Sequence, residues 1–388
     1  AFFETNKGNY YASSGIGAAY VAMINHLTKK LQLNWGLRLE SANQTSSTVQ
    51  YEYAPGYRNP QLFTIDDNTK QVQFNLLPSA TLDYHFAKWI AFGVSYARTV
   101  SRPMLQEMNA YRYYDAENFM VKGGNTFLGA ALINNLNVNL NILQGKSGYF
   151  NLTGFYKDID QPIEEVLSGY SSGILLSTPY NMPKAKISGV SSSLRLSLAP
   201  ASRKIFLSSV SVVASATFTN SEVDAGPLRS SVISQTASHT LSGTPYYMYS
   251  AGLVVQDKRF PELSVIYNHT GDYISMVGSG AIIEMPGAKP VSTIADYRVK
   301  DRGQLNVQIA QSFLKMRMQL IAGVSNLLNE SFIRYQDLNG NGKFDSPLIL
   351  SSGNPAGSYI SGTDNTVSRI KAQPLYYFRL SYSFQSNK

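Results

Sequence analysis

Apolar and polar residues alternate with a period of two along most of the chain, which is the signature of β-strands. Every odd position of residues 31–39 is apolar, and every even position is polar or glycine. In residues 132–142, leucine, isoleucine and valine share one face with Asn134, whereas four asparagines occupy the other face. Residues 376–384 alternate aromatic or leucine residues with polar ones in the same way. The pattern therefore predicts an all-β protein.

Thirteen segments carry this pattern, and most are long enough for a tilted transmembrane strand of roughly 9–11 residues. We expect strands at residues 10–25, 30–41, 74–84, 88–98, 131–142, 147–158, 186–198, 204–218, 246–257, 262–274, 303–313, 316–327 and 374–384.

The connections between these strands alternate between short and long without a break. The short turns lie near residues 26–29, 85–87, 143–146, 199–203, 258–261 and 314–315. The long connections span residues 42–73, 99–130, 159–185, 219–245, 275–302 and 328–373. Outer-membrane β-barrels have short periplasmic turns and long extracellular loops. The sequence therefore predicts a transmembrane antiparallel up-and-down β-barrel with its long loops outside the cell.

Each face of such a sheet has its own environment, because hydrocarbon offers no hydrogen-bond partners and a spanning sheet must close on itself. The residues expected to face lipid are Leu33, Trp35, Leu37, Leu136, Val138, Leu140, Phe378, Leu380 and Tyr382. Those expected to face the lumen are Asn137, Asn139, Arg317, Arg379 and Ser381. A soluble all-β protein with one solvated face is the less favoured alternative, since an apolar core would not accept the asparagine row at low cost.

Single-chain bacterial barrels have an even number of strands, and thirteen is odd. Either one strand near residues 1–8 escapes the pattern, or the chain begins partway round a larger barrel. We prefer the second interpretation, because residues 1–8 are too few to span a membrane.

The composition agrees with a membrane barrel and excludes other classes. Hydrophobic residues make up 44% and charged residues 15%, which is too apolar for a disordered chain. Tyrosine and phenylalanine far outnumber tryptophan, which suits an aromatic girdle. The absence of cysteine excludes disulfides, thiol nucleophiles and thiolate metal sites. The net charge of +8 is scattered, so it indicates no nucleic-acid surface, and phosphate-bearing outer-leaflet lipid is an equally good anionic partner.

No enzymatic site is predicted. Residues 169–173 match G-x-S-x-G, but a nucleophile elbow needs a strand before it and a helix after it, and no helical pattern follows. His239 and His269 lie on the expected extracellular side without an evident nucleophile beside them. We therefore interpret the motif as a chance match.

Residues 337–345 resemble the front half of a calcium loop, with oxygen ligands at its first, third, fifth and ninth positions. Those residues are Asp337, Asn339, Asn341 and Asp345. The twelfth position is Leu348, where an EF-hand needs a bidentate glutamate. A Gly/Asn turn is the favoured interpretation, and weak Ca²⁺ binding is the alternative.

Two aromatic and cationic groups in the long connections are candidates for ligand binding, because tyrosine rings stack on sugars or chelates and arginine holds carboxylates. The first group is Tyr111, Arg112, Tyr113 and Tyr114, and the second is Tyr51, Tyr53, Tyr57 and Arg58. Packing between loops, or the outer aromatic girdle, would explain the same residues.

Several segments from about residue 30 to the end resemble TonB-dependent receptors. They are Asn75-Leu76-Leu77-Pro78-Ser79; Ser95-Tyr96-Ala97-Arg98-Thr99 with Arg102-Pro103; Tyr113-Tyr114-Asp115 with Lys122-Gly123-Gly124-Asn125; Phe155-Tyr156-Lys157-Asp158-Ile159 with Pro162-Ile163-Glu164; Gly323-Val324-Ser325-Asn326-Leu327-Leu328-Asn329-Glu330; and Leu380-Ser381-Tyr382-Ser383-Phe384. Thr126 stands where the family motif has proline.

The resemblance implies a barrel of about 22 strands around an N-terminal plug, of which residues 1–388 would be the C-terminal part. It also implies active import of a scarce, bulky nutrient such as a metal chelate, cobalamin or oligosaccharide. The expected partners are the plug, TonB, outer-membrane lipid and lipopolysaccharide, and a surface lipoprotein, in the outer membrane of a Gram-negative bacterium. The alternatives are a barrel that serves as a scaffold in a surface complex, or a 14-stranded passive channel.

Overall fold

The computed structural model describes residues 8–53, 62–143, 145, 148–171, 174–198, 209–225, 238–256, 261–279, 282–283, 291–292, 294–313, 318–338, 342–345 and 364–382. Within these residues no helix has the length and apolar character needed to cross a membrane.

Thirteen long strands follow one another in a single antiparallel sheet, so the predicted number of strands is confirmed. In spatial order they are β1 (Gly8–His26), β2 (Leu31–Tyr53), β3 (Leu62–Ala87), β4 (Ile90–Ser101), β7 (Ala131–Leu143), β8 (Gly148–Asp160), β11 (Lys184–Ser197), β12 (Val210–Asp224), β14 (Tyr247–Val255), β15 (Glu262–Thr270), β20 (Arg302–Phe313), β21 (Met318–Ser325) and β24 (Leu375–Tyr382). The short strand β13 (Ser238–His239) pairs with β12 beside this path.

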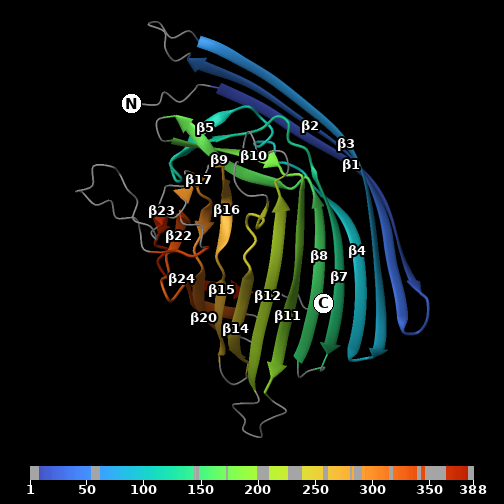
Figure 1. Ribbon diagram of the computed structural model, residues 1–388. Helices are drawn as coiled ribbons and strands as arrows, with labels where there is room; N and C mark the ends of the chain where they lie inside the picture. Colours follow the sequence, from blue (N-terminus) through green and yellow to red (C-terminus); the bar gives the residue numbers. More distant parts are fainter. Residues whose placement is uncertain are drawn as a thin grey trace.

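The sheet is a curved wall with two open edges (Figure 1). Among the described residues, β1 pairs on one side with β2, β24 pairs on one side with β21, and no ladder joins β1 to β24. An edge of unpaired backbone groups is not tolerated in lipid. A closed 14-stranded barrel made by these strands alone is therefore not what the structure describes.

The connection expected at residues 42–73 is wrong, because strands occupy most of it. β2 and β3 remain paired without a register shift from Leu31↔Tyr84 to Tyr53↔Leu62. This hairpin extends well beyond β4, and β1 accompanies it as far as Gly8↔Gln50, as the long blue ribbons of Figure 1 show. Residues 43–48 of β2 and 68–71 of β3 are polar on both faces, so the alternation of apolar residues ends there although the strands continue.

The two faces of the wall differ as the period of two predicts. On the convex face, Trp35, Leu136 and Val138 are 38%, 44% and 40% exposed, and Phe378 is 70% exposed. On the concave face, side chains bond across the strands: Asn137 Nδ2 donates to Ser95 Oγ at 3.3 Å, and Thr153 Oγ1 donates to Asn139 Oδ1 at 2.9 Å. Arg379 and Ser381 alternate with the convex residues of β24, and Arg317 lies outside the described residues. The predicted division of faces is therefore confirmed where the structure describes it.

The connections that the sequence presents as loops contain strands of their own, which was not predicted. Eight of these strands form a second sheet. In spatial order they are β23 (Asn365–Ile370), β22 (Phe332–Gln336), β19 (Tyr297–Val299), β16 (Tyr273–Gly278), β9 (Ile163–Ser171), β10 (Ile174–Asn181), β6 (Met120–Gly123) and β5 (Arg112–Asp115). We call it the loop sheet. It lies at one end of the wall on the concave side (Figure 1). A separate small ladder joins β17 (Ile282–Ile283) and β18 (Val291–Ser292).

The largest buried core lies where the loop sheet meets the upper rim of the wall. Strand residues Ala131, Ile159 and Val223 of the wall pack with Val166 and Val277 of the loop sheet. Burial of these side chains stabilises the junction by the hydrophobic effect. The described parts of these connections are therefore packed as part of the folded domain.

Candidate functional site

The connection after β4 is fixed to the concave face of β2 and β3 by polar contacts. The Glu40 carboxylate, 10% exposed, accepts from Arg38 Nε at 2.5 Å and from Arg102 Nη2 at 2.6 Å. Gln44 Nε2 donates to the carbonyl of Pro103 at 3.3 Å. A buried arginine–carboxylate pair is geometrically demanding, so it sets the position at which this connection enters the mouth of the barrel.

An aromatic cluster lies at this mouth. The rings of Tyr111 and Tyr113 are stacked, with centroids 6.4 Å apart and an interplanar angle of 19°. Tyr10 lies on the concave face of β1, and its ring centroid is 5.9 Å from that of Tyr111. Tyr10 is 43% exposed, and the residues around Tyr111 and Tyr113 bury them only in part. The cluster offers a surface on which a planar or sugar-like ligand can stack.

The other two residues of the first predicted group do not join the cluster. Arg112 pairs with Gly123 of β6, and its side chain lies over that glycine. A Cβ added to Gly123 would lie 3.3 Å from Arg112 Cγ. Tyr114 is 42% exposed and alternates with Tyr113 along β5. The structure thus brings Tyr111 and Tyr113 together and directs Arg112 and Tyr114 elsewhere.

The β5–β6 turn beside this cluster is held by Asp115. Its Oδ1 accepts from the backbone N–H of Glu117 at 3.0 Å, and its Oδ2 accepts from Asn118 Nδ2 at 2.6 Å. Burial alone would raise the pKa of Asp115, but the hydrogen bonds from Asn118 and Glu117 outweigh burial and lower that pKa. The carboxylate therefore stays charged and fixes the turn.

The second predicted group is placed only in part. Tyr51 and Tyr53 belong to β2 and not to a loop, and the structure does not describe their side chains. Tyr57 and Arg58 lie outside the described residues. Their role in ligand binding stays a prediction.

The candidate calcium segment forms a turn where it is described. Asp337 Oδ2 accepts from the backbone N–H of Gly342 at 2.7 Å, and the N–H of Asp345 donates to Asp364 Oδ2 at 2.8 Å. Asn339 and Asn341 lie outside the described residues. Within the described part of the chain, no three carboxylate or histidine side chains are grouped as metal ligands. Weak Ca²⁺ binding here stays a prediction.

A buried histidine–carboxylate pair joins two of the long connections. His239 Nε2 lies 2.8 Å from Glu164 Oε2, and the backbone N–H of Ser242 donates to Glu164 Oε1 at 2.8 Å. The two side chains are 5% and 0% exposed. Burial alone would lower the pKa of His239, but the hydrogen bond and charge of Glu164, together with the charge of Asp296, raise it. Sequence reasoning missed this pair, because 75 residues separate its members.

The G-x-S-x-G match has no elbow geometry in its described part. Gly169, Tyr170 and Ser171 continue the antiparallel strand β9, and the two residues after them lie outside the described chain. His269 stacks against both Tyr247 and Tyr249 on the convex face, with ring centroids 5.6 and 5.0 Å away. This arrangement resembles an aromatic girdle at a lipid boundary.

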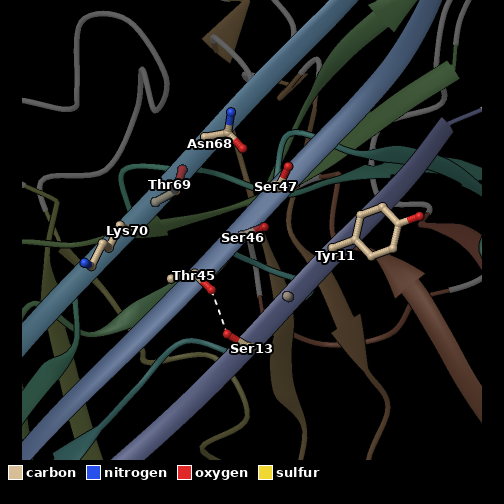
Figure 2. A pocket seen from close by; sticks show the side chains of 9 residues that line it. Tyr11, Ser13, Thr45, Ser46, Ser47, Asn68, Thr69 and Lys70 are labelled. Carbon is tan, nitrogen blue, oxygen red and sulfur yellow. Dashed lines mark hydrogen bonds between the residues drawn. The ribbon is translucent and has the colours of Figure 1, made fainter.

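One hollow lies on the convex face of the long hairpin (Figure 2). It has a volume of about 380 Å³. Its side chains come from β1, β2 and β3 and include Tyr11 and Lys70, and Ser13 bonds to Thr45 at 2.7 Å. Tyr11 follows Tyr10 in the strand, so the hollow and the aromatic cluster lie on opposite faces of the wall. The hollow is therefore separate from the mouth.

Comparisons with known proteins agree with this architecture. Residues 2–327 match the family model described as TonB dependent receptor-like, beta-barrel. No curated protein matches the chain.

Solved receptor structures show the same fold at low identity. The ferric yersiniabactin uptake receptor FyuA from Yersinia pestis is 14% identical, with a TM-score of 0.56 over 97% of this chain and 47% of its own. The ferric-catecholate import receptor Fiu from K12 E. coli is 14% identical, with a TM-score of 0.54 over 84% of this chain and 42% of its own. The copper transporter OprC is 12% identical, with a TM-score of 0.59 over 96% of this chain and 50% of its own.

The chain thus spans about half the length of the solved structures that it matches. Since the family model covers most of the chain, the chain belongs to the TonB-dependent receptors, within their β-barrel domain.

Proposed function

We propose that this protein is a receptor in the outer membrane of a Gram-negative bacterium that imports a scarce, bulky nutrient with energy supplied through TonB. Membership of the family is the observation that carries this proposal. The proteins with similar structures are named as importers of ferric chelates or copper. A metal chelate is therefore the first class of nutrient to test, followed by cobalamin and oligosaccharides.

The mouth of the barrel supports a receptor more than a simple channel. The loop sheet lies over the concave side of the wall, and Tyr10, Tyr111 and Tyr113 present aromatic surface there. A passive channel needs no such stacking surface. The open edges at β1 and β24 also argue against a 14-stranded channel formed by these strands alone.

The proposed partners follow from the same architecture. The polar concave face can hold a plug domain, and TonB would act through segments that are not among the described strands. The apolar convex face would contact membrane lipid, with lipopolysaccharide in the outer leaflet. A surface lipoprotein that covers the extracellular mouth is a further proposed partner.

Energised uptake tests the proposal. The receptor, expressed from its natural gene in a Gram-negative host that lacks its own ferric-chelate receptors, should restore uptake of at least one radiolabelled probe from a panel of ferric chelates, cobalamin and oligosaccharides. A protonophore, or deletion of the host's TonB, should abolish that uptake. Uptake that continues without the proton gradient would indicate a channel. Assembly with a surface lipoprotein without any uptake would indicate a scaffold.

A further inference from the structure

The hollow on the convex face of the long hairpin has a polar floor (Figure 2). Ser13, Thr45 and Ser47 supply hydroxyl groups, and Asn68 supplies an amide. Ser13 and Thr45 pair across β1 and β2, and their hydroxyl oxygens lie 2.7 Å apart. The volume of about 380 Å³ falls within the range of roughly 300–1,000 Å³ that small-ligand sites occupy. The hollow therefore has the size and the hydrogen-bonding groups of a site for a small polar ligand.

An aromatic ring and an ammonium group border this floor. Tyr11 of β1 and Lys70 of β3 lie on opposite sides of β2 (Figure 2), and both are exposed. Tyr11 is 70% exposed, so its ring is free to stack on the apolar face of a sugar. None of the described residues that line the hollow carries a carboxylate, so Lys70 makes it positive. A sugar with phosphate or carboxylate substituents fits these groups, because an ammonium is a compact charge that binds anionic oxygens.

The hollow lies above the apolar part of the convex face. Leu39, Val72 and Phe74 are 38%, 67% and 71% exposed there and mark the end of the apolar band. Lys70 lies four residues beyond Phe74, and its partner Thr45 lies six residues beyond Leu39. At ~3.4 Å per residue and a strand tilt of ~40°, these separations place the hollow about 10–16 Å above the band along the membrane normal.

This height distinguishes between the lipids of an outer membrane. The polar headgroup region adds only about 5–8 Å to each side of the hydrocarbon core of a bilayer. The headgroup of a phospholipid therefore ends below the hollow. Lipopolysaccharide in the outer leaflet carries a chain of phosphorylated sugars above its lipid part, and these sugars reach the level of the hollow.

We infer that the hollow binds phosphorylated sugars of the core oligosaccharide of lipopolysaccharide. This inference rests on the outer-membrane location in the proposed function and gives one of its proposed partners a site. Tyr11 stacks on a sugar ring, Lys70 binds a phosphate, and the floor of the hollow bonds to sugar hydroxyls. Tyr10 and Tyr11 alternate along β1, so one strand faces the mouth on its concave side and the saccharide layer on its convex side. The extension of β1, β2 and β3 thus anchors the receptor in that layer.

Equilibrium binding of three lipids tests the site. The probes are lipopolysaccharide with a complete core, a truncated form that keeps the lipid part and lacks the core sugars, and phosphatidylglycerol. The receptor, expressed from its natural gene, would be purified in detergent from a host that makes only the truncated form, and thermophoresis would give each Kd. The complete form should bind at least tenfold more tightly than the other two lipids. Added salt should reduce this difference, because the contact of Lys70 is ionic.

Variants of the two bordering residues separate the charge from the ring. Lys70→Gln should weaken binding of the complete form about tenfold, as expected for loss of a charge-assisted hydrogen bond. Tyr11→Ala should weaken it about three- to tenfold, whereas Tyr11→Phe keeps the ring and should bind like the wild type. Lys88→Gln is the matched control, since Lys88 is an exposed lysine in the short turn between β3 and β4, at the far end of the same strand. It should bind like the wild type, and every variant should unfold at the wild-type temperature.

Two results would overturn the site: equal affinity of the wild type for the complete and truncated forms, or equal affinity of the wild type and the Lys70→Gln/Tyr11→Ala double variant for the complete form. The first result would mean that only the apolar band contacts the lipid. Both are distinct from failure of import. If the complete form binds through Lys70 and Tyr11 but no nutrient is taken up with energy, the site stands and the import proposal fails. If uptake is energised but the double variant binds as the wild type does, import stands and the site fails.

Discussion

Replacement of Val138 by arginine would place a charge in the middle of the apolar band on the convex face. Val138 is 40% exposed and pairs with Val94 and Gly154. At the upper end of the same face, Tyr96 Oη donates to Asn134 Oδ1 at 3.0 Å, as expected for a polar boundary. At the lower end of β7, Ile142 is the last convex residue.

The depth of Val138 follows from strand geometry. The distance from Asn134 to Ile142 is about 27 Å along the strand at ~3.4 Å per residue, or about 21 Å along the membrane normal at a tilt of ~40°. Val138 lies halfway, close to the midplane. Arginine on the lipid face of a barrel costs about 2–4 kcal/mol at that depth and about 0–1 kcal/mol near the interface. We therefore expect Val138→Arg to lower the free energy of unfolding by about 2–4 kcal/mol.

The matched variant is Asn139→Arg, one residue along on the concave face. It removes the 2.9 Å hydrogen bond from Thr153, which is worth about 1 kcal/mol, and it keeps the new charge in the polar lumen. Both variants would be unfolded with guanidinium from lipid vesicles, monitored by tryptophan fluorescence. If Asn139→Arg destabilises the protein as much as Val138→Arg does, the assignment of the two faces is wrong.

Three other outcomes follow from the loops. Because the pKa of His239 is raised in the folded protein, its bond to Glu164 is fully stabilising below the ordinary histidine pKa of 6.5 and is lost as pH rises through the higher folded pKa. The rate of amide hydrogen exchange in the connection that contains Glu164 should therefore increase above that pH. His239→Gln should remove this pH dependence. Arg102→Ala leaves the buried Glu40 carboxylate with one cation fewer, at a cost of about 3 kcal/mol or more, so limited proteolysis after β4 should become faster while cleavage elsewhere is unchanged. Calcium should bind the last long connection with a Kd of roughly 10⁻⁴–10⁻³ M, and Asp345→Asn should weaken that binding. If isothermal titration of the wild type with calcium gives no heat of binding, the segment is a turn and not a calcium site.

The wall was predictable because its signal is local. Alternation in segments such as 132–142 depends on which face each neighbouring side chain meets, and the convex and concave faces differ strongly in polarity. The number of strands and the faces of Val138 and Asn139 follow from that contrast. The length of β2 and β3 did not follow, because Gln44, Thr45, Ser46 and Ser47 are polar on both faces, while packing of the β4 connection buries Gln44 and Ser46.

The mouth was much less predictable, because its contacts join residues far apart in the chain. Tyr111 and Tyr113 could be proposed from composition, but Tyr10 enters the cluster only through the curvature of the wall. The loop sheet includes parallel ladders of a few residues, such as Leu175↔Met120, between different connections. Such short strands have no period of their own to detect. A pair like His239 and Glu164 likewise has no signal in either local sequence.

Four of the long connections supply the strands of the loop sheet, and backbone hydrogen bonds join them into one element. Insertions or deletions within β9 or β16 would break ladders to neighbouring connections, so variation in loop length should be confined to the stretches between these strands. Antibodies or phages that recognise this surface would then contact segments of variable length and sequence, held by a loop sheet that does not vary. By the same coupling, a ligand that moves one connection displaces its neighbours, so the mouth would open and close as a unit.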